Sequence, residues 1–299
     1  MKFTIIAFPL LFLIACKSDN VSNQRLIVCS TSIIASCISE IVGDDFTVES
    51  LMGPGVDPHS YNPRPNDIKE LNSAAVIIYN GFHLEGKMQT IFKRLKLQTK
   101  VFALSDFYPK KSQIKLNQQG ATDPHIWFGS FEWLKSLKTV TDHLGSIYPT
   151  YKLGFKQRFS LFSEKITRFS NQTILLFKQI PQSQRVLITS HDAFHYFGNT
   201  FGLKVMALQG VSTVQEPSLK HVYALVDFIV EHNVKALYLE HSVSPKTVQL
   251  ILESATKRHA KVKLGGTLYS DALGPKNHLS GTYLGMLKHN CWTIYKSLK

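Results

Sequence analysis

The sequence has few cysteines, and their spacing is not that of a disulfide framework or a thiolate metal site. There are four, at positions 16, 29, 37 and 291, and no Cys-x-x-Cys pair occurs. Without Cys16, which belongs to the N-terminal segment, an odd number remains. Cys29 and Cys37 stand among Val, Ile and Ala, so we expect small buried side chains there. The state of these thiols and of Cys291 stays open from the sequence.

Long hydrophobic runs are also lacking, apart from one at the N-terminus. After Met1-Lys2, residues 3–15 form an apolar run, which is shorter than the roughly 20 residues of a membrane-spanning helix and is typical of a secretion signal. The run ends in Leu13-Ile14-Ala15-Cys16, which resembles the lipobox of bacterial lipoproteins. We predict a signal peptide over residues 1–15, lipid attachment at Cys16 and a polar tether over residues 16–24. The protein would then be extracytoplasmic and anchored to a membrane, in the periplasm or at the cell surface.

Acidic residues are fewer than basic ones. The 34 Lys and Arg against 21 Asp and Glu give a formal net charge of +13. The basic residues are dispersed along the chain rather than gathered in one stripe, which argues against nucleic acid as a partner. We interpret them as a solvated surface near anionic lipid headgroups.

What the sequence does contain is an alternation of short apolar runs with segments of helical periodicity. This alternation predicts parallel βαβ units, and therefore an α/β protein with two doubly wound domains, over residues 25–148 and 180–299. No Gly/Ser-rich linker separates them. Instead, residues 149–179 carry apolar side chains at helical spacing, which predicts one linking helix of about 45 Å. Such a connector is stiff, and we expect it to limit hinge motion between the domains.

Three of the twelve histidines stand in unusual local settings. His59 and His125 each follow a proline, which fixes the local backbone, and His191 comes directly after a predicted strand. Asp271 follows a further predicted strand. Ligands of open α/β sheets bind beyond the carboxyl ends of the strands, so two facing domains would bring these four side chains together. Three imidazoles and one carboxylate suit zinc, or manganese and iron with less preference.

These segments resemble a known family, the cluster A-I or TroA-like metal-binding receptors of zinc and manganese ABC importers. The resemblance rests on three segments: Gly55-Val-Asp-Pro-His59-Ser-Tyr61, Asp123-Pro-His125-Ile-Trp127 and Ser190-His191-Asp192-Ala-Phe194. It implies two α/β domains joined by a long helix and a metal site in the cleft between them. It also implies the metal ligands His59, His125, His191 and Asp271.

The resemblance extends to partners and supporting residues. We expect Asp57, Asp192 and Glu240 to support the ligands. The expected partner is the membrane permease of an ABC importer, and the expected oligomeric state is a monomer. A solute-binding receptor of this kind is not an enzyme.

The identity of the metal stays open between zinc, our first choice, and manganese or iron. Residues 109–122 contain no histidine, whereas many zinc-specific relatives carry a His-rich or acidic loop between the first two ligands. Manganese-specific relatives typically place Glu where this chain has His191, which favours zinc.

Two alternatives from other functional classes remain. His191 and His195 are spaced as in the His-Glu-x-x-His motif of zinc hydrolases, although a catalytic zinc needs an open position that four protein ligands would close. The chain could also be an adhesin-type surface lipoprotein with an incidental metal, but adhesion would not explain the paired domains.

Overall fold

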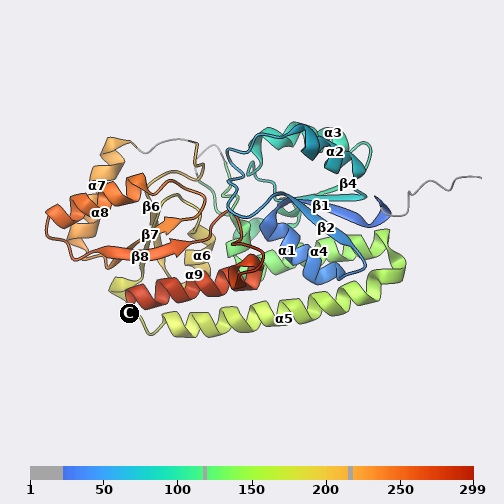
Figure 1. The fold of residues 1–299 in the computed structure, drawn as a ribbon. Coiled ribbons are helices and arrows are strands. Elements are labelled where there is room, and N and C mark those ends of the chain that lie inside the picture. Colours follow the sequence, from blue (N-terminus) through green and yellow to red (C-terminus); the bar gives the residue numbers. More distant parts are fainter. Residues whose placement is uncertain (1–22, 117–119, 215–217) are drawn as a thin grey trace, which may run out of the picture.

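The computed structural model describes residues 23–116, 120–214 and 218–299, and these contain two four-stranded parallel sheets (Figure 1). Their strand orders are β2-β1-β3-β4 and β6-β5-β7-β8, the same arrangement in each half. The strands of the first sheet are β1 Leu26–Thr31, β2 Thr47–Met52, β3 Val76–Tyr79 and β4 Lys100–Ala103. Those of the second are β5 Val186–Thr189, β6 Lys204–Ala207, β7 Ala236–Glu240 and β8 Lys263–Leu268. The predicted α/β class with two parallel-sheet domains is confirmed.

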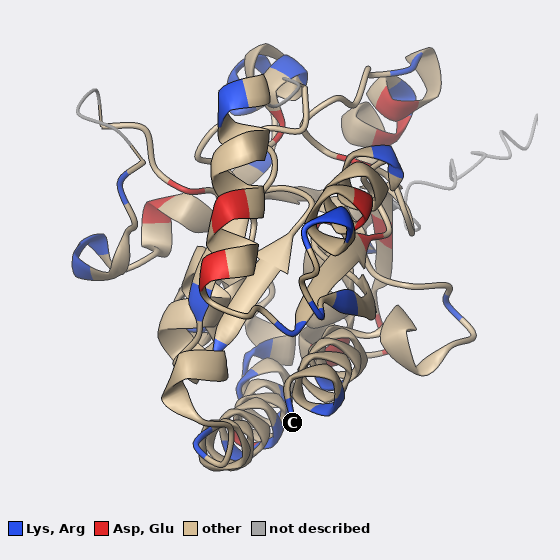
Figure 2. Ribbon diagram, turned by 90° about the vertical axis from the view of Figure 1, so that its left-hand side faces the viewer, with Lys and Arg blue, Asp and Glu red and all other residues tan. Residues whose placement is uncertain are grey.

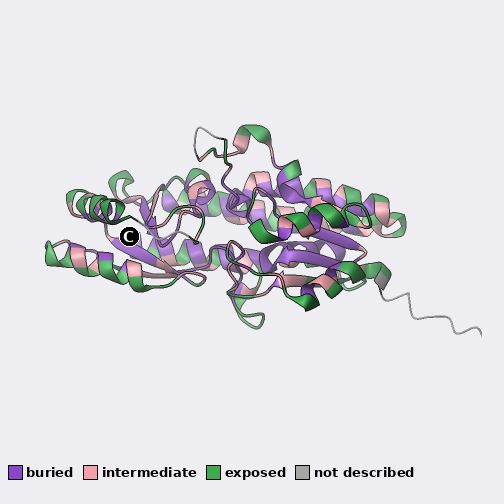
Figure 3. Ribbon diagram, turned by 90° about the horizontal axis from the view of Figure 1, so that it is seen from above, coloured by how far each residue is buried: buried purple, intermediate pink, exposed green. Residues whose placement is uncertain are grey.

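Helices cover both sheets, as parallel sheets require because their strands are apolar on both faces. Figure 3 shows the buried central strands flanked by helices whose outer surfaces are exposed. Besides α5, the α-helices are α1 Ser32–Val42, α2 Pro65–Ser73, α3 Gln89–Leu95, α4 Ser130–Ile147, α6 His195–Phe201, α7 Leu219–Glu231, α8 Lys246–Lys257 and α9 Tyr283–Leu298. Short 3-10 helices are Asn23–Arg25, Gly86–Met88, Leu104–Phe107, Lys110–Ser112, Ile126–Phe128, Pro149–Tyr151, Gln182–Gln184 and Leu279–Gly281.

The long helix α5 spans Lys152–Phe177, close to the predicted 149–179. Its 26 residues correspond to about 39 Å. Pro149–Tyr151 form a 3-10 turn before it, and the chain leaves the helix ahead of Pro181. Helix α5 contacts α1 and α4 in the first half and α6 and α9 in the second, and Figure 1 shows it running beneath both sheets.

Helix α4 is an element that we did not predict. Its buried residues Trp133, Leu137, Val140 and Leu144 follow helical spacing, so the periodic signal is present. However, the helix begins after Gly129 without a capping side chain, and the expected start signal is therefore missing.

The two halves share one hydrophobic core, which includes residues from Ile27 to Leu298. Hydrogen bonds also cross between them. The Trp127 indole N–H donates to the Ser270 carbonyl at 3.0 Å, and the Tyr283 hydroxyl donates to the Trp127 carbonyl at 2.6 Å. The chain after β8 is thus fixed to the first half as well as to its own sheet.

Cys29, Cys37 and Cys291 are buried free thiols, which confirms the expectation for the first two. Burial raises the pKa of each thiol, so none has the character of a reactive thiolate.

The signal peptide, Cys16 and the tether up to residue 22 lie outside the described residues. In the part of the chain that is described, no helix is both long enough and apolar enough to traverse a bilayer.

The charged side chains follow the predicted dispersed pattern. On the face that Figure 2 shows, Lys and Arg are spread over separate helices and loops rather than along one groove.

Candidate metal centre

The structure brings His59, His125, His191 and Asp271 together, with one potential ligand atom from each lying within 4.8 Å of all the others. They come from loops between the two sheets. His59 lies in the loop after β2, His191 two residues after β5 and Asp271 three residues after β8. His125 directly precedes the 3-10 helix Ile126–Phe128.

The separations within this cluster match the size of a zinc ion's ligand shell. His125 Nε2 lies 3.3 Å from His59 Nε2, 3.4 Å from His191 Nε2 and 3.4 Å from Asp271 Oδ1. His191 Nε2 lies 3.3 Å from Asp271 Oδ2. Bond lengths of 2.0 to 2.1 Å from a tetrahedral centre place neighbouring ligands about 3.3 to 3.4 Å apart. The donor set therefore fits a metal ion of this size.

The first buried imidazole is held by Asp123. Its Oδ1 lies 2.8 Å from His125 Nδ1 and also accepts the His125 backbone N–H at 2.9 Å. With Nδ1 facing a carboxylate, Nε2 is left to point at the cluster, which is the usual arrangement of a metal-binding histidine. We did not predict Asp123 as a supporting residue, although it belongs to the Asp-Pro-His segment.

The second buried imidazole also faces a carboxylate, that of Glu240, which ends β7. Glu240 Oε2 lies 2.7 Å from His191 Nδ1, and its Oε1 accepts the His191 backbone N–H at 2.8 Å. Glu240 thus lies where a supporting residue is expected.

The other two predicted supporting residues lie differently. Asp57 Oδ1 accepts the backbone N–H of His59 at 2.8 Å, so Asp57 positions the loop and not the ring. Asp192 Oδ1 lies 3.2 Å from His195 Nε2, while His195 Nδ1 lies 3.1 Å from Asp123 Oδ2. Asp192 therefore reaches the cluster only indirectly, through His195 and Asp123.

The spacing of His191 and His195 does not form a hydrolase motif here. The sequence predicts a helix over residues 192–202, but α6 begins only at His195, so His191 precedes the helix and the two rings are not on one helical face. His195 is absent from the cluster and faces Asp123 and Asp192 instead.

The imidazoles and carboxylates of the cluster shift one another's pKa values through their charges and hydrogen bonds. Burial favours a neutral His125, but Asp123 and Asp271 outweigh it and raise the pKa to about 9. Burial also lowers the pKa of His191. The nearby carboxylates of Glu240 and Asp271 outweigh burial and raise this pKa well above its usual range. Burial lowers the pKa of His59 to about 4, with repulsion from the other imidazoles adding to it.

The pKa of the carboxylate in the cluster shifts in the opposite direction to those of His125 and His191. Burial raises the pKa of Asp271, but His191 and His125 hold it well below the usual range. Asp271 is therefore a buried carboxylate that stays ionised, and it can face a cation.

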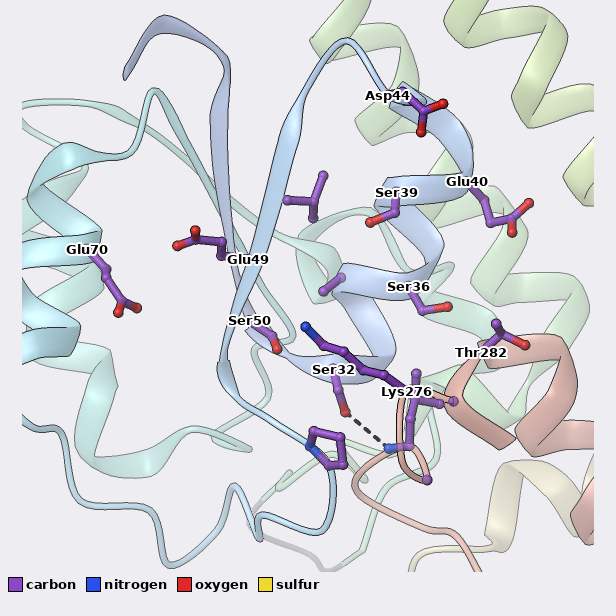
Figure 4. Close-up of a pocket in the computed structure, with 16 residues that line it drawn as sticks. Ser32, Ser36, Ser39, Glu40, Asp44, Glu49, Ser50, Glu70, Lys276 and Thr282 are labelled. Carbon is purple, nitrogen blue, oxygen red and sulfur yellow. Dashed lines mark hydrogen bonds between the residues drawn. The ribbon is translucent and has the colours of Figure 1, made fainter. Parts of the chain in front are cut away.

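Figure 4 shows a separate hollow of about 720 Å³. It opens between α1, β2 and the loop after β8, and its labelled side chains include Glu40, Glu49, Glu70 and Lys276. None of the four clustered residues lines it. Three members of the cluster are enclosed, since His125 and His191 are 0% and Asp271 is 1% exposed, while His59 is half-buried.

The structure has two parallel-sheet halves and one long helix that runs along both. Side chains of the kinds that bind metals meet between the halves. These features define a two-domain binding protein. The family model described as "Zinc-uptake complex component A periplasmic" matches residues 27–297. This protein belongs to that family.

Individual relatives agree with this assignment. The chain is 37% identical over 298 residues to the manganese-binding lipoprotein MntA of Bacillus subtilis (strain 168), covering 98% of this chain and 97% of MntA. It is 36% identical over 282 residues to the zinc-binding protein TroA of Treponema pallidum (strain Nichols), covering 94% and 91%. The solved structure of the Treponema pallidum periplasmic zinc-binding protein TroA superposes with a TM-score of 0.89 at 35% identity, covering 92% of this chain and 99% of that one.

Proposed function

We propose that this protein captures a divalent transition metal ion outside the cytoplasm and delivers it to the membrane permease of an ABC importer. The ligands in this proposal are His59, His125, His191 and Asp271. The observation that carries it is the cluster, in which one donor atom from each of the four residues lies within 4.8 Å of the others and two of the imidazoles have carboxylates behind them.

Zinc is the first choice for the ion, and manganese or iron are the alternatives. Three borderline nitrogen donors and one carboxylate favour zinc over a carboxylate-rich manganese shell. The named relatives divide between manganese and zinc, and raw affinity favours zinc even in sites that serve manganese in the cell. Affinity alone is therefore a poor guide to the physiological cargo.

The setting follows from the same proposal. The chain would be monomeric and attached to the membrane through Cys16, in keeping with the lipoprotein relative MntA. We further propose the division into residues 25–148, 149–179 and 180–299, supported by two separate sheets and the long helix between them.

We infer that the protein is a receptor and not an enzyme. A catalytic zinc requires a coordination position for water, whereas four protein donors complete a tetrahedral shell. Neither the hydrolase nor the adhesin alternative has a specific observation in its favour.

The test is the metal content of the protein exported by its native host, measured together with metal uptake in a deletion strain. Bound zinc and impaired zinc uptake are expected. Manganese or iron loading with normal zinc uptake would replace zinc by that metal and keep the importer proposal. Normal uptake of all three metals in the deletion strain would contradict the importer proposal.

A further inference from the structure

One of the four proposed ligands is enclosed less than the others. His125, His191 and Asp271 are buried, while His59 is half-buried and lies on a loop over residues 53–64 that contains no helix or strand. Gly55, in a turn closed by the Val56 N–H to Gly53 carbonyl bond, has a φ of +73°, which L side chains rarely adopt. An ion that enters or leaves at this loop displaces less of the protein than one that passes the three buried ligands.

This loop is tied to the other half of the molecule by Asp57. Its Oδ1 accepts the His59 backbone N–H at 2.8 Å, and its Oδ2 accepts the Ser60 hydroxyl at 2.8 Å. The same Oδ2 accepts the hydroxyl of Thr213 at 2.6 Å, across 156 residues of sequence. Two of these bonds stay within the loop, and the third reaches the second half.

Thr213 lies three residues beyond a segment that is hydrogen-bonded close to the second-half ligands. It lies in the loop after β6, whose first residues are hydrogen-bonded beside His191: the Gln209 N–H donates to the Ser190 carbonyl at 3.0 Å, and the Asp192 N–H donates to the Gly210 carbonyl at 3.3 Å. A bond from Thr213 to Asp57 therefore holds the His59 loop against the half that contributes His191 and Asp271.

We propose that Thr213 is a positioning residue that latches the His59 loop over the bound ion, so that breaking its bond to Asp57 opens the path for release. This inference rests on the proposed metal-binding function. A hydrogen bond to a carboxylate is stronger than one between neutral groups, yet a single bond at a half-buried position is weak enough to open during delivery.

The experiment compares metal dissociation rates, measured by stopped-flow transfer of zinc to a chelator, for the full chain and three variants. Thr213→Val keeps the side-chain shape and removes the hydroxyl, and its dissociation rate is expected to rise by about tenfold. Thr213→Ser restores the hydroxyl and is expected to return the rate to within about twofold of the unchanged protein. Thermal unfolding of the metal-free variants checks that the fold is intact.

Ser60→Ala is the matched control, because it removes the other hydroxyl from the same Asp57 oxygen without touching the second half. The metal dissociation rate of this variant is expected to stay within about twofold of that of the unchanged protein. Equal acceleration by Ser60→Ala and Thr213→Val would overturn the latch, since the hydroxyls would then only shape the loop. An unchanged rate in Thr213→Val, or failure of Thr213→Ser to restore it, would also overturn it. If the unchanged protein binds no metal, the proposed function fails, whereas normal binding with unaltered release in Thr213→Val removes the latch alone.

Discussion

At the scale of single residues, Asp123 shows how a neighbouring carboxylate orients a histidine ring. It faces His125 Nδ1 at 2.8 Å, as Glu240 faces His191 Nδ1 at 2.7 Å, and both carboxylates are buried. The two buried imidazoles are thus oriented alike. Burial raises the pKa of Asp123, but His125 and His195 outweigh this effect and lower it to about 2, so its carboxylate stays ionised.

Removing either negative charge should weaken metal binding. We expect Asp123→Asn and Glu240→Gln each to lower zinc affinity by about 10- to 100-fold, because the amide no longer fixes or strengthens the imidazole. Competition titration against a chromophoric chelator measures the change. Asp227→Asn is the matched control, since Asp227 is exposed and pairs with Arg258 away from the cluster. Wild-type affinity in both test variants would contradict the supporting role.

The ligands themselves provide a stricter test. Single alanine substitutions at His59, His125, His191 and Asp271 should each reduce binding of the native metal, because each removes one of four donors. Isothermal titration calorimetry gives the affinities. Near-native binding in two or more of these variants would rule out the site.

The sequence predicted His59, His125 and His191 because each stands in a short, recognisable segment, and Asp271 because it follows a predicted strand. The hydrogen bonds that organise them were harder to foresee. Asp123 lies two residues from His125 and was within reach of sequence reasoning, since an Asp before a Pro-His pair can fold back on the ring. Thr213 could not be predicted, because its contact with Asp57 joins loops 156 residues apart and the sequence around Thr213 contains no motif that we recognised.

At the scale of elements, α5 is held to the first half by a partly buried polar contact as well as by its apolar face. Arg158 Nε donates to the Ile41 carbonyl at 2.9 Å, and its Nη2 donates to the Val42 carbonyl at 2.8 Å. These carbonyls belong to the last turn of α1, where no further backbone N–H is available to them. The guanidinium therefore caps α1 from the neighbouring helix.

Loss of this cap should destabilise the protein. We expect Arg158→Ala to lower the free energy of unfolding by about 2 kcal/mol, because two charge-assisted hydrogen bonds at a partly buried site are lost. Arg168→Ala on the same helix is the control. Arg168 forms an exposed pair with Glu164, so its removal should cost less than about 1 kcal/mol. Urea denaturation followed by circular dichroism compares them, and equal losses would argue against the cap.

Element boundaries differ from the predicted ones mainly where tertiary contacts replace local signals. The sequence predicts strands that start at Arg25 and Arg185, and β1 and β5 begin one residue later, because each is a compact apolar run next to a turn. Helix α6 begins three residues later than predicted. The His191 carbonyl, which a helix starting at Asp192 would use in its first turn, instead accepts the Ala193 N–H at 3.0 Å and the Thr189 hydroxyl at 2.9 Å.

For the whole molecule, the shared core and the crossing hydrogen bonds oppose a wide opening between the halves. Separating them would break the contacts of α5 and α9 with both halves and the bonds that join Trp127 to Ser270 and Tyr283. We therefore expect small-angle scattering profiles of metal-free and metal-loaded protein to agree closely, with release confined to loops. Profiles that differ by a large hinge closure would contradict this expectation.

Attachment to the membrane is a separate whole-molecule prediction. Cys16→Ser should release the protein into the soluble fraction, because a thioether-linked lipid can no longer form at this position. Cell fractionation and electrophoretic mobility measure the change. Retention in the membrane fraction with unchanged mobility would argue against acylation at Cys16.

The indole of Trp127 gives the molecule an internal optical probe. Its ring centroid lies 5.3 Å from that of His125, and its N–H is bonded to the residue before Asp271. Of the three tryptophans, Trp133 is buried in the core and Trp292 is exposed, so the emission of Trp127 can be distinguished by substituting the other two. A paramagnetic ion such as Mn²⁺ beside this ring would quench its fluorescence, while closed-shell Zn²⁺ would mainly shift it. The emission wavelength and intensity of Trp127 would then distinguish bound Zn²⁺ from a bound paramagnetic ion without any added dye.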